Sequence, residues 1–254
     1  MARAAVPGRL GGRLTWHAAR LVAHHAETPT ATTLVLEVPD WPGHLAGQHV
    51  DLRLTADDGY QAVRSYSLAA PAAGDRVELT VQRVPDGEVS PYLTEGFAIG
   101  DAIEIRGPAG GWFVWRPTDE APVLLVAGGA GIVPLMAMVR ARRAARSRVP
   151  FRLVYSVRTP DEVYYLDDLG APQPGDGGLD VRYLYTRSAP DGFARPPGRL
   201  TAEDLRNGVW PPVFPPECFV CGPTGFVEAV ADLLVGLGHE PRRVKTERFG
   251  PSGG

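Results

Sequence analysis

Nineteen consecutive residues without a charged side chain, Ala121 to Val139, constrain the fold of this chain more than any other feature. A charge-free run of this length meets the length criterion for a membrane-spanning helix. Inside the run, however, Gly128-Gly129-Ala130-Gly131 and Pro134 interrupt any helix. The five apolar residues 123–127 instead predict a buried parallel strand, followed by a tight turn and a new helix. We therefore expect a soluble protein.

The first half of the chain alternates short β-branched segments with turn signals such as Asp57-Asp58-Gly59 and Pro71-Ala72-Ala73-Gly74. Six short strands at this spacing predict an antiparallel barrel or sandwich. The predicted strands are Trp16–Ala23, Thr30–Val38, Gln48–Leu54, Arg64–Leu68, Arg76–Val84 and Ala102–Gly107.

The pattern changes near residues 116–120. Beyond them, strand patterns alternate with helical patterns, which predicts a parallel, doubly wound sheet. The strand patterns lie at 123–127, 151–156, 180–186, 217–221 and 243–247, and the helical patterns near 133–146, 161–169, 201–206 and 223–237. We expect a tail at 1–15, an N-terminal antiparallel six-stranded β-barrel at 16–117, and a C-terminal α/β doubly wound parallel sheet at 118–254.

Charge and cysteine content narrow the classes of function. The chain has 26 Lys and Arg against 29 Asp and Glu, a net charge of −3. This balance excludes a generally basic nucleic-acid binder and gives no reason to expect attraction to an anionic membrane. Two cysteines cannot build a disulfide scaffold, and no signal peptide is apparent, so we expect a cytoplasmic protein. Because Lys245 is the only lysine, any single arginine is weak evidence for a site.

The glycine-rich turn is a candidate phosphate-binding site. Strand 123–127 leads into Gly129-x-Gly131-x-x-Pro134 and then into a helix. Glycines let the backbone approach a pyrophosphate, and the helix N-terminus supplies unpaired N–H groups. Proline is well placed in the first helical turn. Many isolated matches to this fingerprint are simple turns, but the strand before it and the helix after it favour a dinucleotide site.

The second expected strand of this half ends Tyr155-Ser156-Val157-Arg158. It therefore lacks the Asp or Glu that binds ribose hydroxyls in NAD sites. Taken alone, Arg158 is equally compatible with a solvated surface residue.

A second candidate site is the string Arg64-Ser65-Tyr66-Ser67 in the predicted barrel. Strand alternation puts Arg64 and Tyr66 on one face. A guanidinium can bind a pyrophosphate through two hydrogen bonds, and a tyrosine ring can stack on a flat heterocycle. On its own, the string is also compatible with an ordinary structural strand.

Cys218 and Cys221 have a spacing found in redox dithiols and zinc sites. On a strand, residues three apart point to opposite faces and lie about 10 Å apart, which exceeds the roughly 7 Å reach of a disulfide. His239 alone cannot complete a zinc site. We therefore expect no metal site and a packing role for Cys218, whereas Cys221 lies at the strand end where α/β ligands bind.

Taken in order, the motifs of this chain resemble those of the ferredoxin–NADP reductase family. They are Arg64-x-Tyr66-Ser67, Gly87-x-x-Ser90, Gly129-x-Gly131-x-x-Pro134, Cys221-Gly222-Pro223 and Glu247-Arg248-Phe249. Their order and spacing match from about residue 16 onward. In that family, a flavin-binding antiparallel barrel precedes a nicotinamide-dinucleotide domain, which is the division predicted above.

The resemblance implies a set of flavin contacts. Arg64, with Gly87, Val89 and Ser90, would hold the pyrophosphate, and Ser65 belongs to the same cofactor-binding motif. Tyr66 would stack on the isoalloxazine, Ser67 would lie near its N5, and Phe249 would cover the opposite face. The Gly87–Ser90 segment is similar to that of FAD-binding members and not to that of FMN-binding ones.

The resemblance also implies nicotinamide contacts from Cys221, Gly222 and Pro223. It makes Ser67, Cys221 and Glu247 the candidate catalytic residues. For Glu247, two alternatives stay open: a role in proton relay or nicotinamide orientation, or a charge partner for Arg248 or Arg243. The extension Gly250-Pro251-Ser252-Gly253-Gly254 resembles that of oxygenase-associated reductases and weakens the first alternative.

Three arginines resemble the positions that hold the 2′-phosphate in bacterial NADP-dependent members of the family: Arg158, Arg187 and Arg199. Guanidinium groups there would pair with a dianionic phosphate, and we expect no acidic residue to oppose them. These residues favour NADPH, although NADH remains possible.

The combined expectation is a flavin-dependent oxidoreductase. It would pass a hydride from NADPH to FAD and then single electrons to a separate acceptor, such as a ferredoxin or an oxygenase component. The chain has no cysteine cluster for an iron–sulfur centre of its own. Two alternatives stay open: a free-flavin or quinone reductase, and a non-catalytic flavin-binding electron-transfer subunit.

Overall fold

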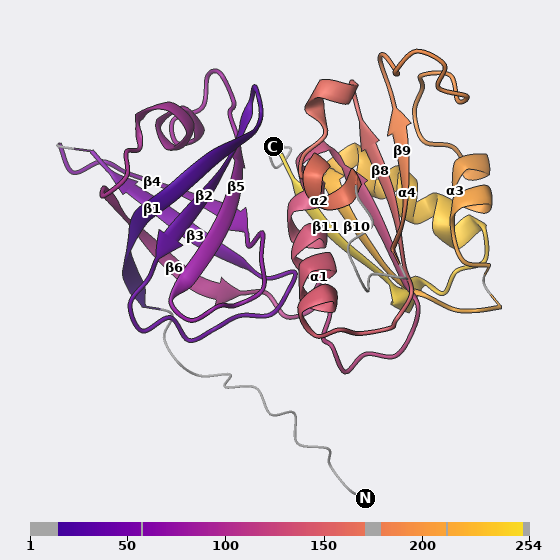
Figure 1. Ribbon diagram of the computed structural model, residues 1–254, viewed down its shortest axis with the longest axis horizontal. Coiled ribbons are helices and arrows are strands. Elements are labelled where there is room, and N and C mark those ends of the chain that lie inside the picture. The colour runs from indigo at the N-terminus through magenta and orange to yellow at the C-terminus, as the bar shows by residue number, and fades with distance from the viewer. Residues whose placement is uncertain (1–14, 57, 171–178, 212, 251–254) are drawn as a thin grey trace, which may run out of the picture.

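The computed structural model describes residues 15–56, 58–170, 179–211 and 213–250, which form two lobes side by side (Figure 1). Most of the expected N-terminal tail, the predicted surface loop at 171–178 and the last four residues of the C-terminal extension lie outside the described residues.

The first lobe is a six-stranded antiparallel sheet with the order β4-β3-β6-β1-β2-β5. Its strands are β1 Trp16–Thr28, β2 Ala31–Glu37, β3 His49–Thr55, β4 Gln61–Ser67, β5 Arg76–Gln82 and β6 Ala102–Ala109. Leu68 and Leu79 form an isolated bridge between the two edge strands, and among the described residues no continuous ladder joins β4 and β5. The predicted six-stranded antiparallel barrel is therefore confirmed in an incompletely closed form.

Strand β2 shows how the first lobe is packed. Leu34 and Leu36 point into the core of the barrel, as alternation requires. The opposite face of a barrel strand usually meets solvent. On β2 the first part of this face is buried as well, because Ala31 packs into a cluster that belongs mainly to the second lobe, and Thr33 is fully buried. The two lobes thus share a packed interface.

The second lobe is a parallel sheet with the order β11-β10-β7-β8-β9. Its elements are β7 Val123–Gly128, α1 Ile132–Ala144, β8 Phe151–Val157, α2 Leu166–Gly170, β9 Leu179–Tyr185, α3 Ala202–Gly208, β10 Glu217–Pro223, α4 Thr224–Gly236 and β11 Val244–Phe249. Helix α1 covers the face nearer the barrel, and α3 and α4 cover the other face (Figure 1). The predicted doubly wound α/β sheet is confirmed.

The charge-free run 121–139 forms β7, a 3₁₀ turn at Gly129–Gly131 and the first half of α1. All six residues of β7 are buried, as a central parallel strand requires. In the part of the chain that the structure describes, no helix is long and apolar enough to cross a bilayer.

The helix predicted at 161–169 is wrong in extent. A 3₁₀ turn at Pro160–Glu162 is followed by the short helix α2, which begins only at Leu166. Between them, Tyr165 has a φ of +57°, outside the helical region. Its side chain and backbone N–H are bonded to the first lobe instead of to a helix. A contact with a distant segment therefore overrides the local helical pattern.

Candidate functional site

Strand β4 presents Arg64 and Tyr66 on one face of the first lobe. The guanidinium of Arg64 is half-exposed, and its Nη2 lies 2.8 Å from Oε2 of Glu88. Tyr66 packs against the barrel core, and burial raises the pKa of its hydroxyl to about 12, an effect that Arg64 partly offsets. A cation and a partly exposed aromatic ring thus stand side by side on the strand.

Ser65 points away from this pair. Its hydroxyl donates to Oδ1 of Asp51 at 2.7 Å, across the ladder between β4 and β3. The structure therefore does not bring the Ser65 side chain together with Arg64 and Tyr66.

The loop that contains Gly87, Val89 and Ser90 lies beside Arg64, because Glu88 in the same loop holds the guanidinium. Val89 and Ser90 are buried, and Ser90 Oγ accepts the N–H of Val84 at 3.0 Å. A Cβ on Gly87 would come within 3.0 Å of Ser90 Oγ. The side chains of Val89 and Ser90 hold the loop in shape, and the backbone is what the loop can offer an anion.

The glycine-rich turn joins β7 to α1 at the carboxyl edge of the parallel sheet. Gly129 has a φ of +53°, which favours glycine, and its Cβ direction faces open space. Gly131 differs, because a Cβ there would lie 2.1 Å from the carbonyl oxygen of Cys221. Pro134 is buried in the first turn of α1, whose N-terminus has no side-chain cap. The N–H of Ile132 already donates to the carbonyls of Gly129 and Ala130, and Pro134 has no N–H. The backbone N–H groups of the glycine turn itself are therefore the candidates for binding a ligand.

Cys221, Gly222 and Pro223 form the end of β10. Cys221 is buried, and burial, followed by the charge of Glu247, raises the pKa of its thiol well above the ordinary value. This side chain is therefore a neutral thiol and not a thiolate nucleophile. Cys218 packs in the cluster on the opposite face of the sheet, as strand alternation predicted, and both cysteines are free.

Glu247 on β11 links the two lobes. It lies opposite Cys221 in the ladder between β10 and β11, and its Oε1 accepts the hydroxyl of Ser67 at 3.4 Å. Burial raises the pKa of Glu247 from 4.5 to about 7, and the Ser67 contact partly offsets this rise. The structure thus brings together the three candidate catalytic residues from β4, β10 and β11.

A pocket of about 360 Å³ opens between the glycine turn, the end of β8 and Phe249. A second pocket, of about 420 Å³, adjoins it, since both are lined by Ser156, Thr186, Pro223 and Phe226. Phe249 remains 37% exposed at the end of β11. The two pockets together hollow the carboxyl edge of the sheet, where ligands of such folds bind.

Two of the three predicted arginines line these pockets. Arg158 lines the first pocket and Arg199 the second. Arg187 donates its backbone N–H to the carbonyl of Arg158 at 2.9 Å, while its exposed side chain lines neither pocket. The expectation that no acidic residue opposes them is wrong: Oε2 of Glu162 lies 2.7 Å from Nε of Arg158 and lines the same pocket. Sequence reasoning placed Glu162 in a helix and so missed it.

Two other residues of the candidate sites, Glu88 and Phe226, were also missed. Glu88 follows Gly87 in a predicted motif, but only folding shows that it holds Arg64. Phe226 contacts Gly128 and Gly222 so closely that a Cβ on either glycine would lie less than 3 Å from its ring. Paired glycines at two strand ends were the available signal for this contact. Among the described residues, no group of three or more His, Cys, Asp or Glu could hold a metal ion.

The residues present fit two cofactors. Arg64, the partly exposed ring of Tyr66 and the backbone of the Gly87–Ser90 loop are groups that can bind the pyrophosphate and the flat ring of a flavin dinucleotide. The close approach at Gly131 and the uncapped N-terminus of α1 match a second dinucleotide on the other lobe.

Two family models match the chain: an oxidoreductase FAD-binding domain over residues 19–114 and an oxidoreductase NAD-binding domain over residues 125–232. A flavohemoprotein of Pseudomonas putida is 32% identical over 213 residues, which are 81% of this chain and 51% of that protein. The reductase component of propane 2-monooxygenase from Mycolicibacterium smegmatis is 31% identical over 195 residues, 74% of this chain and 54% of that protein.

Among solved structures, a cytochrome P450 reductase from Amycolatopsis superposes with a TM-score of 0.83 at 27% identity, covering 97% of this chain and 73% of that one. The chain spans about half to two thirds of the length of the curated relatives it matches.

Proposed function

The chain belongs to the ferredoxin–NADP reductase family, and from this premise we propose that it passes reducing equivalents from NADPH through FAD to a separate acceptor. One observation carries the proposal: the contact between Ser67 and Glu247 joins the two candidate cofactor sites across the lobes. When bound, FAD accepts a hydride from a nicotinamide nucleotide and releases electrons singly. In this proposal the division between the FAD-binding and nucleotide-binding domains lies near residue 117.

We assign FAD to the first lobe. Arg64 would bind the pyrophosphate, together with backbone groups of the Gly87–Ser90 loop that Val89 and Ser90 hold in shape. Tyr66 would supply the stacking surface, because its neutral ring is only partly buried against the barrel core and is next to Ser67, which contacts the other lobe. Binding would redirect Arg64 from its present partner Glu88.

We assign the nicotinamide nucleotide to the second lobe. Gly129, Gly131 and Pro134 shape the turn that would receive its pyrophosphate at the N-terminus of α1. Cys221, Gly222 and Pro223 would border the nicotinamide, and Phe249 would shield the flavin face until the nucleotide enters.

Glu247 would hold or release a proton beside Ser67. A carboxyl group with a pKa of about 7 changes its protonation state near neutral pH, where both forms are populated. The neutral thiol of Cys221 would contribute shape and exclude water, because burial keeps it protonated.

For the choice of nucleotide, we propose that Arg187 and Arg199 bind the 2′-phosphate of NADPH. Both side chains are exposed at the carboxyl edge, and neither has an ion pair among the described residues. Arg158 is already engaged by Glu162, whose carboxylate would repel a phosphate and suits a ribose hydroxyl better. The Arg158–Glu162 pair therefore reduces the preference for NADPH that the arginines would otherwise provide.

The acceptor is proposed to be a separate protein. Two relatives support this: a propane 2-monooxygenase reductase component and a reductase component of a naphthalene dioxygenase/salicylate hydroxylase system of Ralstonia. Electron transfer to an added ferredoxin or oxygenase component, faster than to quinones or free flavins alone, would support this assignment. Equal rates with small acceptors would favour a free-flavin or quinone reductase. An FAD-loaded protein that no nicotinamide nucleotide reduces would point to an electron-transfer subunit.

The FAD assignment is tested by Arg64→Ala, with Arg76→Ala as the control on the same sheet. Loss of a charge-assisted contact costs about 1.5–3 kcal/mol, so FAD should bind on the order of ten- to a hundredfold more weakly. The Arg76 side chain has no ion pair among the described residues, and its removal should leave FAD binding unchanged. Equal retention of FAD in both variants would contradict the assignment.

A further inference from the structure

A ring of hydrogen bonds joins the two lobes beside the first pocket. The hydroxyl of Tyr165 donates to Oγ1 of Thr80 at 2.6 Å, and Thr80 Oγ1 lies 2.7 Å from Thr33 Oγ1. Thr33 donates to Oε1 of Glu27 at 2.6 Å. Glu27 Oε2 then accepts the backbone N–H of Tyr165 at 3.0 Å, so the ring returns to the residue where it began.

The direction of every bond in the ring is fixed, because each hydroxyl has one hydrogen to donate. The hydrogen of Thr33 goes to Glu27, so Thr80 must donate to Thr33 and receive from Tyr165. Thr33 and Tyr165 are 0% and 3% exposed. A fully satisfied buried network of this kind rigidifies the segments that it joins.

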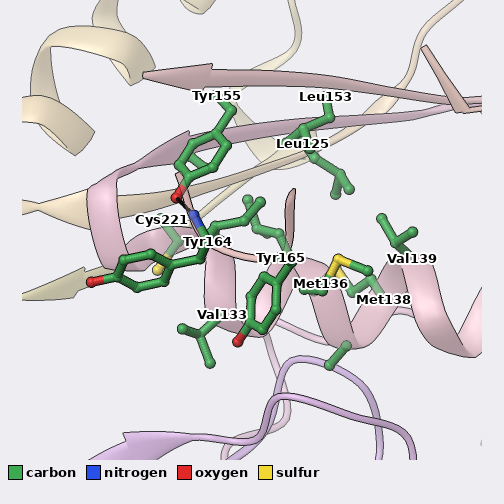
Figure 2. Packing of buried hydrophobic residues seen from close by; sticks show 14 of the residues in the cluster. Leu125, Val133, Met136, Met138, Val139, Leu153, Tyr155, Tyr164, Tyr165 and Cys221 are labelled. Carbon is green, nitrogen blue, oxygen red and sulfur yellow. Dashed lines mark hydrogen bonds between the residues drawn. The ribbon is translucent and has the colours of Figure 1, made fainter. Parts of the chain in front are cut away.

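The backbone conformation of Tyr165 also indicates that this segment is held rigidly. Its φ of +57° is unfavourable for a tyrosine and persists only where the surroundings fix it. On one side, the preceding N–H of Tyr164 donates to the hydroxyl of Tyr155 at 3.3 Å, within the second lobe. On the other side, the Tyr165 hydroxyl points toward the barrel (Figure 2). The segment is therefore held by both lobes.

Arg140 on α1 makes a second bridge between the lobes. Its Nη1 donates to the carbonyl of Ala69 at 3.0 Å and lies 3.2 Å from Oε2 of Glu78, both in the first lobe. Its Nη2 donates to Asp168 in the second lobe at 2.5 Å. The guanidinium carbon lies 4.9 Å from the centre of the Tyr165 ring, so this bridge packs directly against the hydrogen-bonded ring.

The hydrogen-bonded ring also adjoins the nucleotide pocket. Arg158 and Glu162 line the first pocket and lie on the segment that ends at Tyr165. On β5, Gln82 lines the same pocket two residues after Thr80. The ring therefore joins the two segments that flank the pocket, without lining the pocket itself.

We propose that Tyr165, Thr80, Thr33 and Glu27 position the nucleotide-binding lobe against the FAD-binding lobe, so that the two cofactors meet in the reactive orientation. This inference rests on the proposed function. Because the cofactors are held by different lobes, a small rotation of one lobe displaces the reacting atoms. A misplacement of about 1 Å can cost on the order of a hundredfold in rate.

The test uses the full chain loaded with FAD and compares Tyr165→Phe and Thr80→Val with the parent. Thr80→Ser keeps the hydroxyl and serves as the conservative variant. Tyr183→Phe is the matched control, because the buried Tyr183 hydroxyl has no hydrogen-bond partner among the described residues. The measurements are FAD content, the Kd for NADPH and NADH, the limiting rate of flavin reduction, and the charge-transfer absorbance when oxidised nucleotide is added to the protein with its flavin reduced.

We expect Tyr165→Phe and Thr80→Val to lower the limiting rate by about tenfold or more and to weaken the charge-transfer absorbance. FAD content and nucleotide Kd should stay near those of the parent, and the two controls should behave like the parent. If Thr80→Val does not fold, Glu27→Gln replaces it: an amide offers one acceptor oxygen instead of two, so one bond of the ring is lost.

Unchanged limiting rates and charge-transfer absorbance would overturn the positioning role. A rise in Kd with no loss of limiting rate would also overturn it, since the residues would then act on nucleotide binding. A parent protein that neither NADPH nor NADH reduces would refute the proposed function itself. That outcome is visible before any variant is measured.

Discussion

Gly131→Ala should be among the most disruptive single substitutions in the chain, because the glycine lies against backbone and not against flexible side chains. A Cβ at this position would be 2.1 Å from the carbonyl oxygen of Cys221, 2.4 Å from its carbonyl carbon and 2.7 Å from the nitrogen of Gly222. Ordinary contact needs a separation of roughly 3.5 Å. The start of α1 and the end of β10 would therefore have to separate by about 1 Å or more.

This displacement should both destabilise the protein and slow flavin reduction. Overpacking of a core typically costs about 1–3 kcal/mol, and the upper end applies here because the neighbouring atoms belong to backbone. The same separation moves the glycine turn away from Cys221, so flavin reduction should slow by about a hundredfold. Gly236→Ala is the control: a Cβ there meets nothing within 4 Å, and alanine in a helix gains up to about 1 kcal/mol.

Urea unfolding and anaerobic stopped-flow reduction measure the two effects. We expect Gly131→Ala to lose stability and rate together, and Gly236→Ala to lose neither. If Gly131→Ala matched the parent in both measurements, close backbone approach would not be the reason for glycine at this position.

Five further substitutions test the site. Burial raises the pKa of Glu247 from 4.5 to about 7, so its contribution to stability is complete below pH 4.5 and is lost as the pH rises through 7. Relative to Glu247→Gln, the parent's free energy of unfolding should fall by up to about 3 kcal/mol over this range. Parallel pH profiles of the two proteins in urea titrations would contradict this. Glu162→Gln should free Arg158 and raise kcat/KM for NADPH relative to NADH. Arg187→Ala should raise the KM for NADPH by about tenfold or more, if the contact contributes about 1.4 kcal/mol. Equal effects on both nucleotides in steady-state assays would show that these residues have only a structural role. Cys221→Ala should slow flavin reduction in stopped-flow assays more than it lowers stability. Phe249→Ser should favour nucleotide entry and change the discrimination between NADPH and NADH. Reduction rates equal to the parent's for both variants would exclude these residues from the mechanism.

The layers of the fold could be predicted because each follows from a local pattern. Short alternating strands with turn signals predicted the antiparallel lobe, and the charge-free run interrupted by glycines predicted β7, its turn and α1. The interrupted helix at 161–169 could not be predicted in the same way. Its break depends on Tyr165 meeting Thr80 and Glu27, which are distant in the chain.

At the candidate site, too, some features could be predicted from the sequence and others could not. The motifs located Arg64, the glycine turn and the end of β10 because each needs a residue type at a fixed spacing. They did not show that Glu162 pairs with Arg158, or that the carboxyl group of Glu247 meets Ser67. Arg158 and Glu162 are only four residues apart, but their pairing depends on the 3₁₀ turn at Pro160–Glu162, where a longer helix was predicted. Ser67 and Glu247 are distant in the chain and meet only because the two lobes pack together.

Our proposal is that the protein holds FAD on one lobe and accepts a hydride from a nicotinamide nucleotide bound on the other. Its most direct test is an anaerobic titration of the purified full chain with NADPH and NADH, followed by the flavin absorbance, after identification of the flavin released on denaturation. We predict release of FAD and complete bleaching by one equivalent of nucleotide. A protein that releases FMN, or whose bound FAD neither nucleotide reduces, would contradict the account.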